Sequence, residues 1–212
     1  MKHYIYICSF VILLAASSCD KLLDKEPTSQ VSPEKYLNDA SQLGYYANGL
    51  YTNILPSHSG YSLTFVKDQY TDNQAYITPH PIYIKDSWTV PANDSWNFKN
   101  IYDCNYFLER VLPRYEKGEV SGSTTEICQY IGEVLFLRAY EYFDLYQNYG
   151  DLPIVTNTLP DDQTVLTEAS KRFPRNEVAR FILSDLDKAL ELMPEQFESR
   201  RTRINRNCVS LL

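Results

Sequence analysis

Apolar residues recur every three or four positions in four segments of the chain, and this spacing predicts four amphipathic helices. The first is expected to start with Ser32 as N-cap and Pro33 in its first turn. The second covers about 95–112 and is expected to end before Pro113. The apolar face of the first helix consists of Tyr36, Ala40, Leu43, Ala47, Leu50 and Ile54.

Two further helices are predicted towards the C-terminus. The third covers about 124–148, with Gly150 where a glycine commonly ends a helix. The fourth begins near Pro174 and stops at Pro194. Its apolar face consists of Val178, Ile182, Leu186, Ala189 and Met193. Because no segment shows convincing alternation of apolar and polar residues, the pattern predicts an all-α domain.

The third helix carries a polar stripe along an otherwise apolar surface, so neighbouring helices are expected to cover most of its circumference. Arg138 lies away from that stripe, and a buried arginine needs a carboxylate partner to offset its desolvation. Glu141, three residues further on, is the local candidate. Asp185 and Asp187 in the fourth helix are candidates across the helix interface. We interpret Arg138 as a structural ion-pair residue, with a ligand role as the alternative.

Residues 57–94, between the first two helices, have no helical period and contain three prolines. A long irregular segment inside a compact domain is usually either functional or disordered. Aromatic residues interleaved with aspartate and asparagine favour an ordered loop with a function.

The N-terminus has the layout of a secretory signal: Lys2 precedes an apolar run of about a dozen residues, shorter than the ~20 that span a membrane. Small residues stand directly before Cys19, as in a lipobox, where cleavage leaves that cysteine to carry a lipid. An ordinary signal with a chance cysteine is the alternative. We expect a lipoprotein signal peptide at 1–18, a lipid-anchored tether at 19–33 and the folded domain at 34–212.

Charge and composition argue against several classes of function. The formal net charge of −7 argues against nucleic-acid binding, because such proteins concentrate Lys and Arg to displace counterions. No histidine has a metal-ligand spacing to another His, Cys or carboxylate, and no nucleophile or phosphate-binding motif occurs. The adjacent Asp161 and Asp162 are more typical of a solvated turn than of an acid–base pair. We expect no enzyme, no metal and no cofactor.

The cysteines of the mature chain do not form a recognisable pattern. Cys104 and Cys128 each lie amid apolar helical positions, so we interpret them as small buried hydrophobic residues. Export makes a disulfide between them the alternative.

Five segments in order carry a resemblance to a known family. They are CDKLLDKEP after the lipobox, YANGLYTNI, WNFKNIYDCNYFLERV, GEVLFLRAYEYFDLYQNYGDLPIV and RNEVARFILSDLDKALELMP. On these segments the chain resembles the SusD/RagB family over 19–207. Members of that family are outer-membrane lipoproteins of Bacteroidota, built on helical pairs of the tetratricopeptide type. They form a lid over a TonB-dependent transporter of SusC type and capture nutrients, commonly glycans.

The resemblance implies a protein anchored in the outer membrane through Cys19, exposed at the cell surface, which binds a glycan and docks on a SusC-type transporter. Ligand contacts in the family often come from aromatic residues in the loop between the first two helices. The candidate ligand residues in that loop are Asp72, Asn73, Tyr76, Tyr83 and Trp88. Packing onto the helices is the alternative for Trp88 and is favoured for Trp96.

Family members are more than twice as long as this chain, and RINRNCVSLL resembles the start of their next helix. We therefore expect a truncated, N-terminal part of the family's scaffold. Two alternatives remain open: a helical-repeat adaptor that binds a protein or peptide, and a fragment without function. A lipid-anchored hydrolase is the least favoured interpretation.

Overall fold

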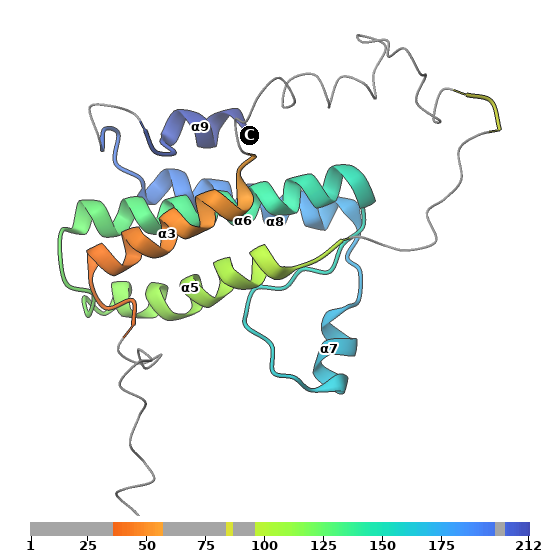
Figure 1. Ribbon diagram of the computed structural model, residues 1–212, viewed down its shortest axis with the longest axis horizontal. Helices are drawn as coiled ribbons and strands as arrows, with labels where there is room; N and C mark the ends of the chain where they lie inside the picture. Colours follow the sequence, from red (N-terminus) through yellow and green to blue (C-terminus); the bar gives the residue numbers. More distant parts are fainter. Residues whose placement is uncertain (1–35, 57–83, 87–95, 198–201) are drawn as a thin grey trace, which may run out of the picture. The chain divides into compact units, whose positions relative to one another are not determined.

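The computed structural model describes residues 36–56, 84–86, 96–197 and 202–212. The chain divides into two units, Met1–Tyr36 and Leu37–Leu212, and every described helix lies in the second. The helices are α3 (Ala40–Ile54), α5 (Lys99–Glu116), α6 (Thr124–Tyr149), α7 (Gln163–Ala169), α8 (Arg175–Leu192) and α9 (Arg206–Leu211) (Figure 1). This described part is all-α, as predicted, and none of its helices is long and apolar enough to cross a membrane.

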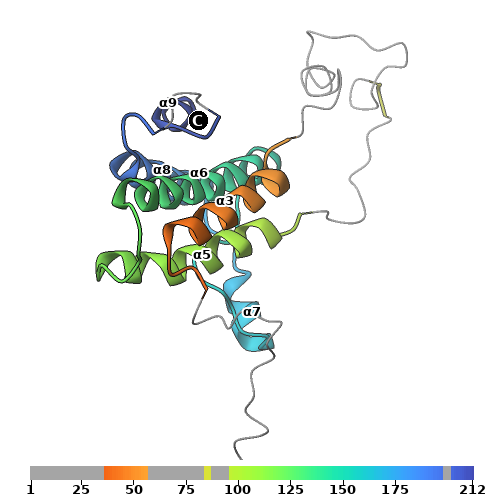
Figure 2. The same ribbon diagram turned by 60° about the vertical axis from the view of Figure 1, so that its left-hand side comes forward.

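Helix α6 is the centre of the second unit, because α3, α5 and α8 all pack against it, α8 most extensively. Figures 1 and 2 show these four longer helices side by side, each running opposite to the one before it in the chain. Every residue from Ile131 to Ala139 of α6 is buried. Neighbouring helices therefore cover α6 around its circumference, as its sequence predicted.

The first helix begins later than the sequence predicted. Asp39, rather than Ser32, is the N-cap of α3, and its side chain accepts a 3.0 Å hydrogen bond from a backbone N–H of the first turn. Residues 36–39 are not helical, and Leu37 has a φ of 64°, in the left-handed region that a right-handed helix excludes. Ser32 itself lies outside the described residues. The predicted apolar face is buried from Ala40 to the end of the helix.

Pro113 does not close α5 as predicted but lies inside its last turn. The helix ends at Glu116, and Gly118, just beyond its C-cap, has a φ of 69°. The N–H groups of Gly118 and of the next residue donate to carbonyls of the last turn at 2.9 and 2.8 Å, which is a Schellman motif. At the other end, α5 begins at Lys99, four residues later than expected. The glycine, which tolerates positive φ, and not the proline therefore sets the end of α5.

Helices α6 and α8 follow the prediction closely. Gly150 ends α6 with a φ of 77°, and α8 begins directly after Pro174. Gly132 permits a close approach between them, because a Cβ there would lie 2.5 Å from Met193 Cγ. The tight packing of α6 on α8 therefore depends on a position without a side chain.

Two short helices complete the unit. The side chain of Asp162 caps α7 by accepting from a backbone N–H at 3.0 Å, so the exposed acidic pair stands at a helix start rather than in a simple turn. Helix α7 buries no residue, which is why no apolar period announced it. Helix α9 is capped by Asn205 and agrees with the expectation that RINRNCVSLL starts a helix.

The cysteines Cys104, Cys128 and Cys208 are free. Cys104 is fully buried in α5, as expected, and burial raises the pKa of its thiol. Cys128 is only half-buried, and its Sγ lies 3.2 Å from the hydroxyl of Tyr115. The two residues are not joined in a disulfide.

Candidate functional site

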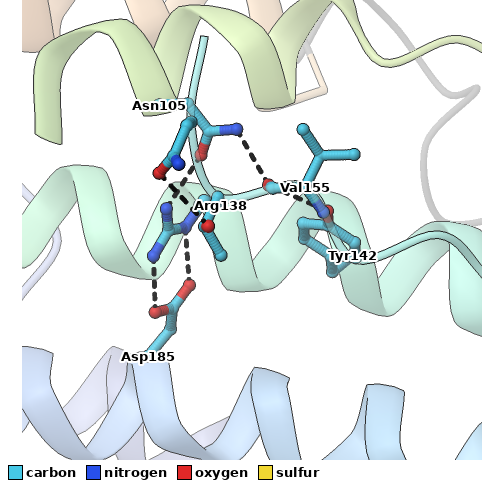
Figure 3. A network of polar contacts seen from close by, with 7 residues as sticks. Asn105, Arg138, Tyr142, Val155 and Asp185 are labelled. Atoms are coloured by element: carbon cyan, nitrogen blue, oxygen red, sulfur yellow. Dashed lines mark hydrogen bonds and ion pairs between the residues drawn. The ribbon is translucent and has the colours of Figure 1, made fainter. Parts of the chain in front are cut away.

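Arg138 stands at the centre of a buried polar network (Figure 3). Its side chain is 8% exposed, and that of Asp185, from α8, is 1% exposed. Arg138 Nε and Nη2 donate to the two carboxylate oxygens of Asp185 at 2.7 and 2.8 Å. Arg138 Nη1 donates to Asn105 Oδ1, on α5, at 2.8 Å. The paired charges and the three hydrogen bonds offset the desolvation of the guanidinium, and Arg138 links α5, α6 and α8.

The network continues into the segment that follows α6. Asn105 Nδ2 donates to the Val155 carbonyl at 2.8 Å. The Tyr142 hydroxyl donates to the same carbonyl at 3.2 Å and accepts from the Val155 N–H at 2.8 Å. Burial raises the pKa of Tyr142 to about 12, so the hydroxyl keeps its proton at neutral pH. The backbone at Val155 is therefore fixed onto the helical core.

Glu141, the local candidate partner for Arg138, has a different contact. Its Oε1 accepts from Asn100 Nδ2 at 2.7 Å, and burial raises the pKa of its carboxyl. Glu141 faces the start of α5, whereas Arg138 extends to Asp185 on α8. Of the three candidate partners, the structure therefore pairs Arg138 with Asp185, across the helix interface, and not with Glu141. Asp187 is exposed.

An apolar cleft of about 350 Å³ opens beside the network. It is bounded by the start of α5 and the residues before it, by the segment 153–159 and by α7. The lining residues are Trp96, Phe98, Ile101, Tyr102, Asn105, Pro153, Val155, Asn157, Leu159, Leu166, Ala169 and Ser170. Because Asn105 and Val155 belong to the Arg138 network, the buried ion pair holds one wall of this apolar cleft in place. Aromatic rings with a few amides suit a ligand that has both an apolar face and hydroxyl groups.

Trp96 both packs on the helices and lines the apolar cleft. Its ring centroid lies 5.6 Å from that of Phe98 and 5.3 Å from that of Tyr149, at the end of α6. Tyr102 lines the same cleft and remains 47% exposed. Trp96 thus packs on the helices, as the sequence favoured, and also lines the apolar cleft.

The sequence did not identify this cleft, because its walls come from three segments that only folding brings together. The one local signal is the pair of aromatic residues, Trp96 and Phe98, directly before α5. The lipid-attachment and ligand residues that the sequence predicted lie outside the described residues: Cys19, Asp72, Asn73, Tyr76, Tyr83 and Trp88. Their roles stay predictions.

A second buried ion pair, between Glu133 and Arg203, was not predicted. The Glu133 side chain is fully buried, and Arg203 Nε and Nη2 donate to its two oxygens at 2.7 and 2.6 Å. Gln129 Nε2 donates to the same carboxylate at 2.7 Å. Glu133 belongs to α6, and Arg203 lies in a basic segment near the C-terminus. This pair fixes the segment before α9 onto α6.

The buried acidic residues of the described part of the chain have defined partners. No group of three or more His, Cys, Asp or Glu side chains within these ranges is placed to hold a metal ion. The two fully buried carboxylates, Asp185 and Glu133, are each paired with an arginine. A carboxylate neutralised in this way is poorly suited to general acid–base catalysis.

Comparison with known families gives a match along most of the chain. The SusD-like family described as "Starch-binding associating with outer membrane" matches residues 21–210. Two SusD-like proteins of Formosa agariphila are 26% and 24% identical to this chain and cover 85% and 94% of it. The chain spans 36% and 40% of the lengths of these two relatives.

Solved structures share the fold. A SusD-like protein from Bacteroides fragilis superimposes with a TM-score of 0.54 at 23% identity, over 87% of this chain and 36% of that one. A SusD-like carbohydrate-binding protein from the same species superimposes with a TM-score of 0.57 at 17% identity, over 82% of this chain and 36% of that one. At such identities the likeness concerns the arrangement of the helices.

Proposed function

The chain belongs to the SusD-like family, and on this basis we propose that it acts as a cell-surface lipoprotein that binds a nutrient glycan. We further propose that it delivers the glycan, without converting it, to a TonB-dependent transporter of SusC type in the outer membrane. The observation that carries the proposal is the match over residues 21–210 to a family described as starch-binding and associated with the outer membrane. Because the chain spans 36% to 41% of its relatives, this activity is proposed for the chain rather than transferred from whole proteins.

The apolar cleft supports the glycan part of the proposal. Sugar rings have an apolar face that packs on aromatic side chains, and hydroxyl groups that bond to amides. The exposed ring of Tyr102 and the amide of Asn157 both line the cleft. We propose that Tyr76, Tyr83 and Trp88 act as stacking platforms for sugar rings, with Asp72 and Asn73 bonding to sugar hydroxyls.

Affinity electrophoresis in gels that contain a panel of polysaccharides tests glycan binding. At least one polysaccharide should retard the protein, and Tyr102→Ala should reduce the retardation. Tyr45→Ala is the matched control, because Tyr45 is an exposed tyrosine of α3 that does not line the cleft. Trp88→Ala tests the loop residues in the same gels. If no polysaccharide retards the protein, and it co-purifies with a protein other than a SusC-type barrel, the helical-repeat adaptor is the better interpretation.

Membrane fractionation tests the anchor separately. The protein should sediment with the outer membrane, and Cys19→Ala should release it into the soluble fraction, because the lipid is then absent. Membrane association of Cys19→Ala as firm as that of the wild type would show that Cys19 carries no anchor.

A further inference from the structure

A second cleft, of about 430 Å³, lies beside the end of α6. Residues 147–151 form one side, and Arg172 and Arg175, just before and at the start of α8, form the other. We call it the arginine cleft. Nothing in the ion-pair networks described above accounts for its two arginines.

Both guanidinium groups of the arginine cleft are held by aromatic rings rather than by carboxylates. Arg172 Cζ lies 4.7 Å from the ring centroid of Trp96, and Arg175 Cζ lies 5.5 Å from that of Tyr146. A ring attracts a guanidinium and restricts its motion but does not neutralise its charge. Within the residues that the structure describes, neither guanidinium has a carboxylate oxygen within 4.0 Å.

One acid lines the arginine cleft, and its contact is to the backbone. Asp151 Oδ1 accepts from the N–H of Arg175 at 3.0 Å. The lining of the cleft therefore contains two guanidinium groups and one carboxylate. The start of α8 adds the partial positive charge of a helix N-terminus. The cleft carries a local excess of positive charge in a chain whose formal net charge is −7.

The arginine cleft and the apolar cleft adjoin at Trp96. Trp96 lines the apolar cleft, and its ring contacts Tyr149 and Arg172, which both line the arginine cleft. A ligand that fills both clefts must therefore present an apolar face next to an anionic group.

We propose that the arginine cleft binds an oxyanion substituent, a carboxylate or a sulfate ester, of a glycan whose ring packs in the apolar cleft. The inference rests on the proposed glycan binding and narrows the ligand to acidic glycans. The planar fork of a guanidinium matches the oxygens of such a group, and a guanidinium already held on an aromatic ring loses little freedom on binding. Because the net charge of the chain is negative, only the cleft itself can attract an anionic glycan, and this attraction weakens as salt screens it.

The experiment compares polysaccharides that differ in charge alone. Affinity electrophoresis is run with dextran and dextran sulfate, and with polygalacturonate and its methyl ester. The protein should bind the charged member of at least one pair more tightly. Arg172→Gln and Arg175→Gln should each weaken that binding about tenfold, and added salt should weaken it in the wild type. Arg180→Gln is the matched control, because it removes the same charge from an exposed position of α8 outside the cleft.

Three results would overturn the inference. Equal binding of the charged and neutral members of both pairs would leave the proposed glycan binding intact and remove its acidic specificity. Loss of binding in Arg180→Gln as large as in Arg172→Gln would place the effect in overall charge rather than in the cleft. Competition by polyglutamate as effective as by dextran sulfate would show that no sugar ring is required. Failure to bind any polysaccharide would instead refute the proposed function.

Discussion

Replacing Asp185 by asparagine tests whether the contact between α6 and α8 depends on a charged pair in the core. The substitution keeps the shape of the side chain but removes its charge. Arg138, 8% exposed, would then face a neutral amide that has one acceptor oxygen where the carboxylate has two. Its guanidinium would lose the opposite charge and one of its two hydrogen bonds to residue 185, and would keep the one to Asn105.

Removing one partner of a buried ion pair costs about 3–5 kcal/mol, because the remaining charge stays desolvated. Screening by solvent, which reduces the value of surface pairs, is small here, since the Asp185 side chain is 1% exposed. Because asparagine retains one hydrogen bond to Arg138, we expect the free energy of unfolding to fall by about 3 kcal/mol, the lower end of this range. Asp187→Asn, at an exposed position of the same helix, should change the free energy of unfolding by no more than about 0.5 kcal/mol.

Urea unfolding followed by far-UV circular dichroism measures both variants. With a slope of about 1–3 kcal/mol/M, a loss of about 3 kcal/mol moves the midpoint by roughly 1–3 M without changing the slope. A double variant with Met at Arg138 and Leu at Asp185 should recover most of the loss, because it leaves no unpaired charge. The reasoning is refuted if Asp185→Asn loses less than about 1 kcal/mol or behaves like Asp187→Asn.

Three further predictions concern stability. Gly132→Ala should lower the free energy of unfolding by about 1–3 kcal/mol, because the added Cβ overlaps Met193, which follows α8. Gly49→Ala, where a Cβ meets open space, should raise it by roughly 0.5–1 kcal/mol. Thermal unfolding compares the two variants, and equal melting temperatures would contradict the packing argument. Arg203→Met should cost about 3–5 kcal/mol by leaving the buried Glu133 carboxylate unpaired, and an unchanged urea midpoint would show that the pair contributes nothing. Burial raises the folded-state pKa of Glu141 above its ordinary 4.5, so its stabilising contribution is present below pH 4.5 and is lost as the pH rises through the raised pKa. Glu141→Gln should not show this loss of stability with pH. Identical stability–pH curves for the wild type and Glu141→Gln would contradict the prediction.

Local signals located the four longer helices because each signal acts within a few turns of the chain. Gly150 and Pro174 marked the boundaries of α6 and α8 correctly. The predicted boundaries were wrong at the start of α3 and at both ends of α5. A left-handed Leu37 delays the start of α3, and α5 continues past Pro113 to the Schellman motif at Gly118.

The candidate site was less accessible from sequence. An arginine within an apolar helix predicted a buried ion pair around Arg138, whereas the aromatic residue Trp96 before α5 was expected to pack on the helices. No comparable sequence signal marked the close helix contact at Gly132, the second ion pair at Glu133 or the two clefts. Each depends on residues that are distant in sequence and adjacent only after the helices have packed.

The sequence by itself determined the all-α class, the covered central helix and the family resemblance, because apolar periodicity and residue order are written along the chain. Only the tertiary structure decided which carboxylate pairs with Arg138, since Glu141 and Asp185 both carry a carboxylate and differ in where the packing of α5 and α8 places them. It also decided that Trp96, Arg172 and the end of α6 meet at one place. Pairing and clefts depend on distances between helices, and those distances are set by the packing of side chains from the whole domain.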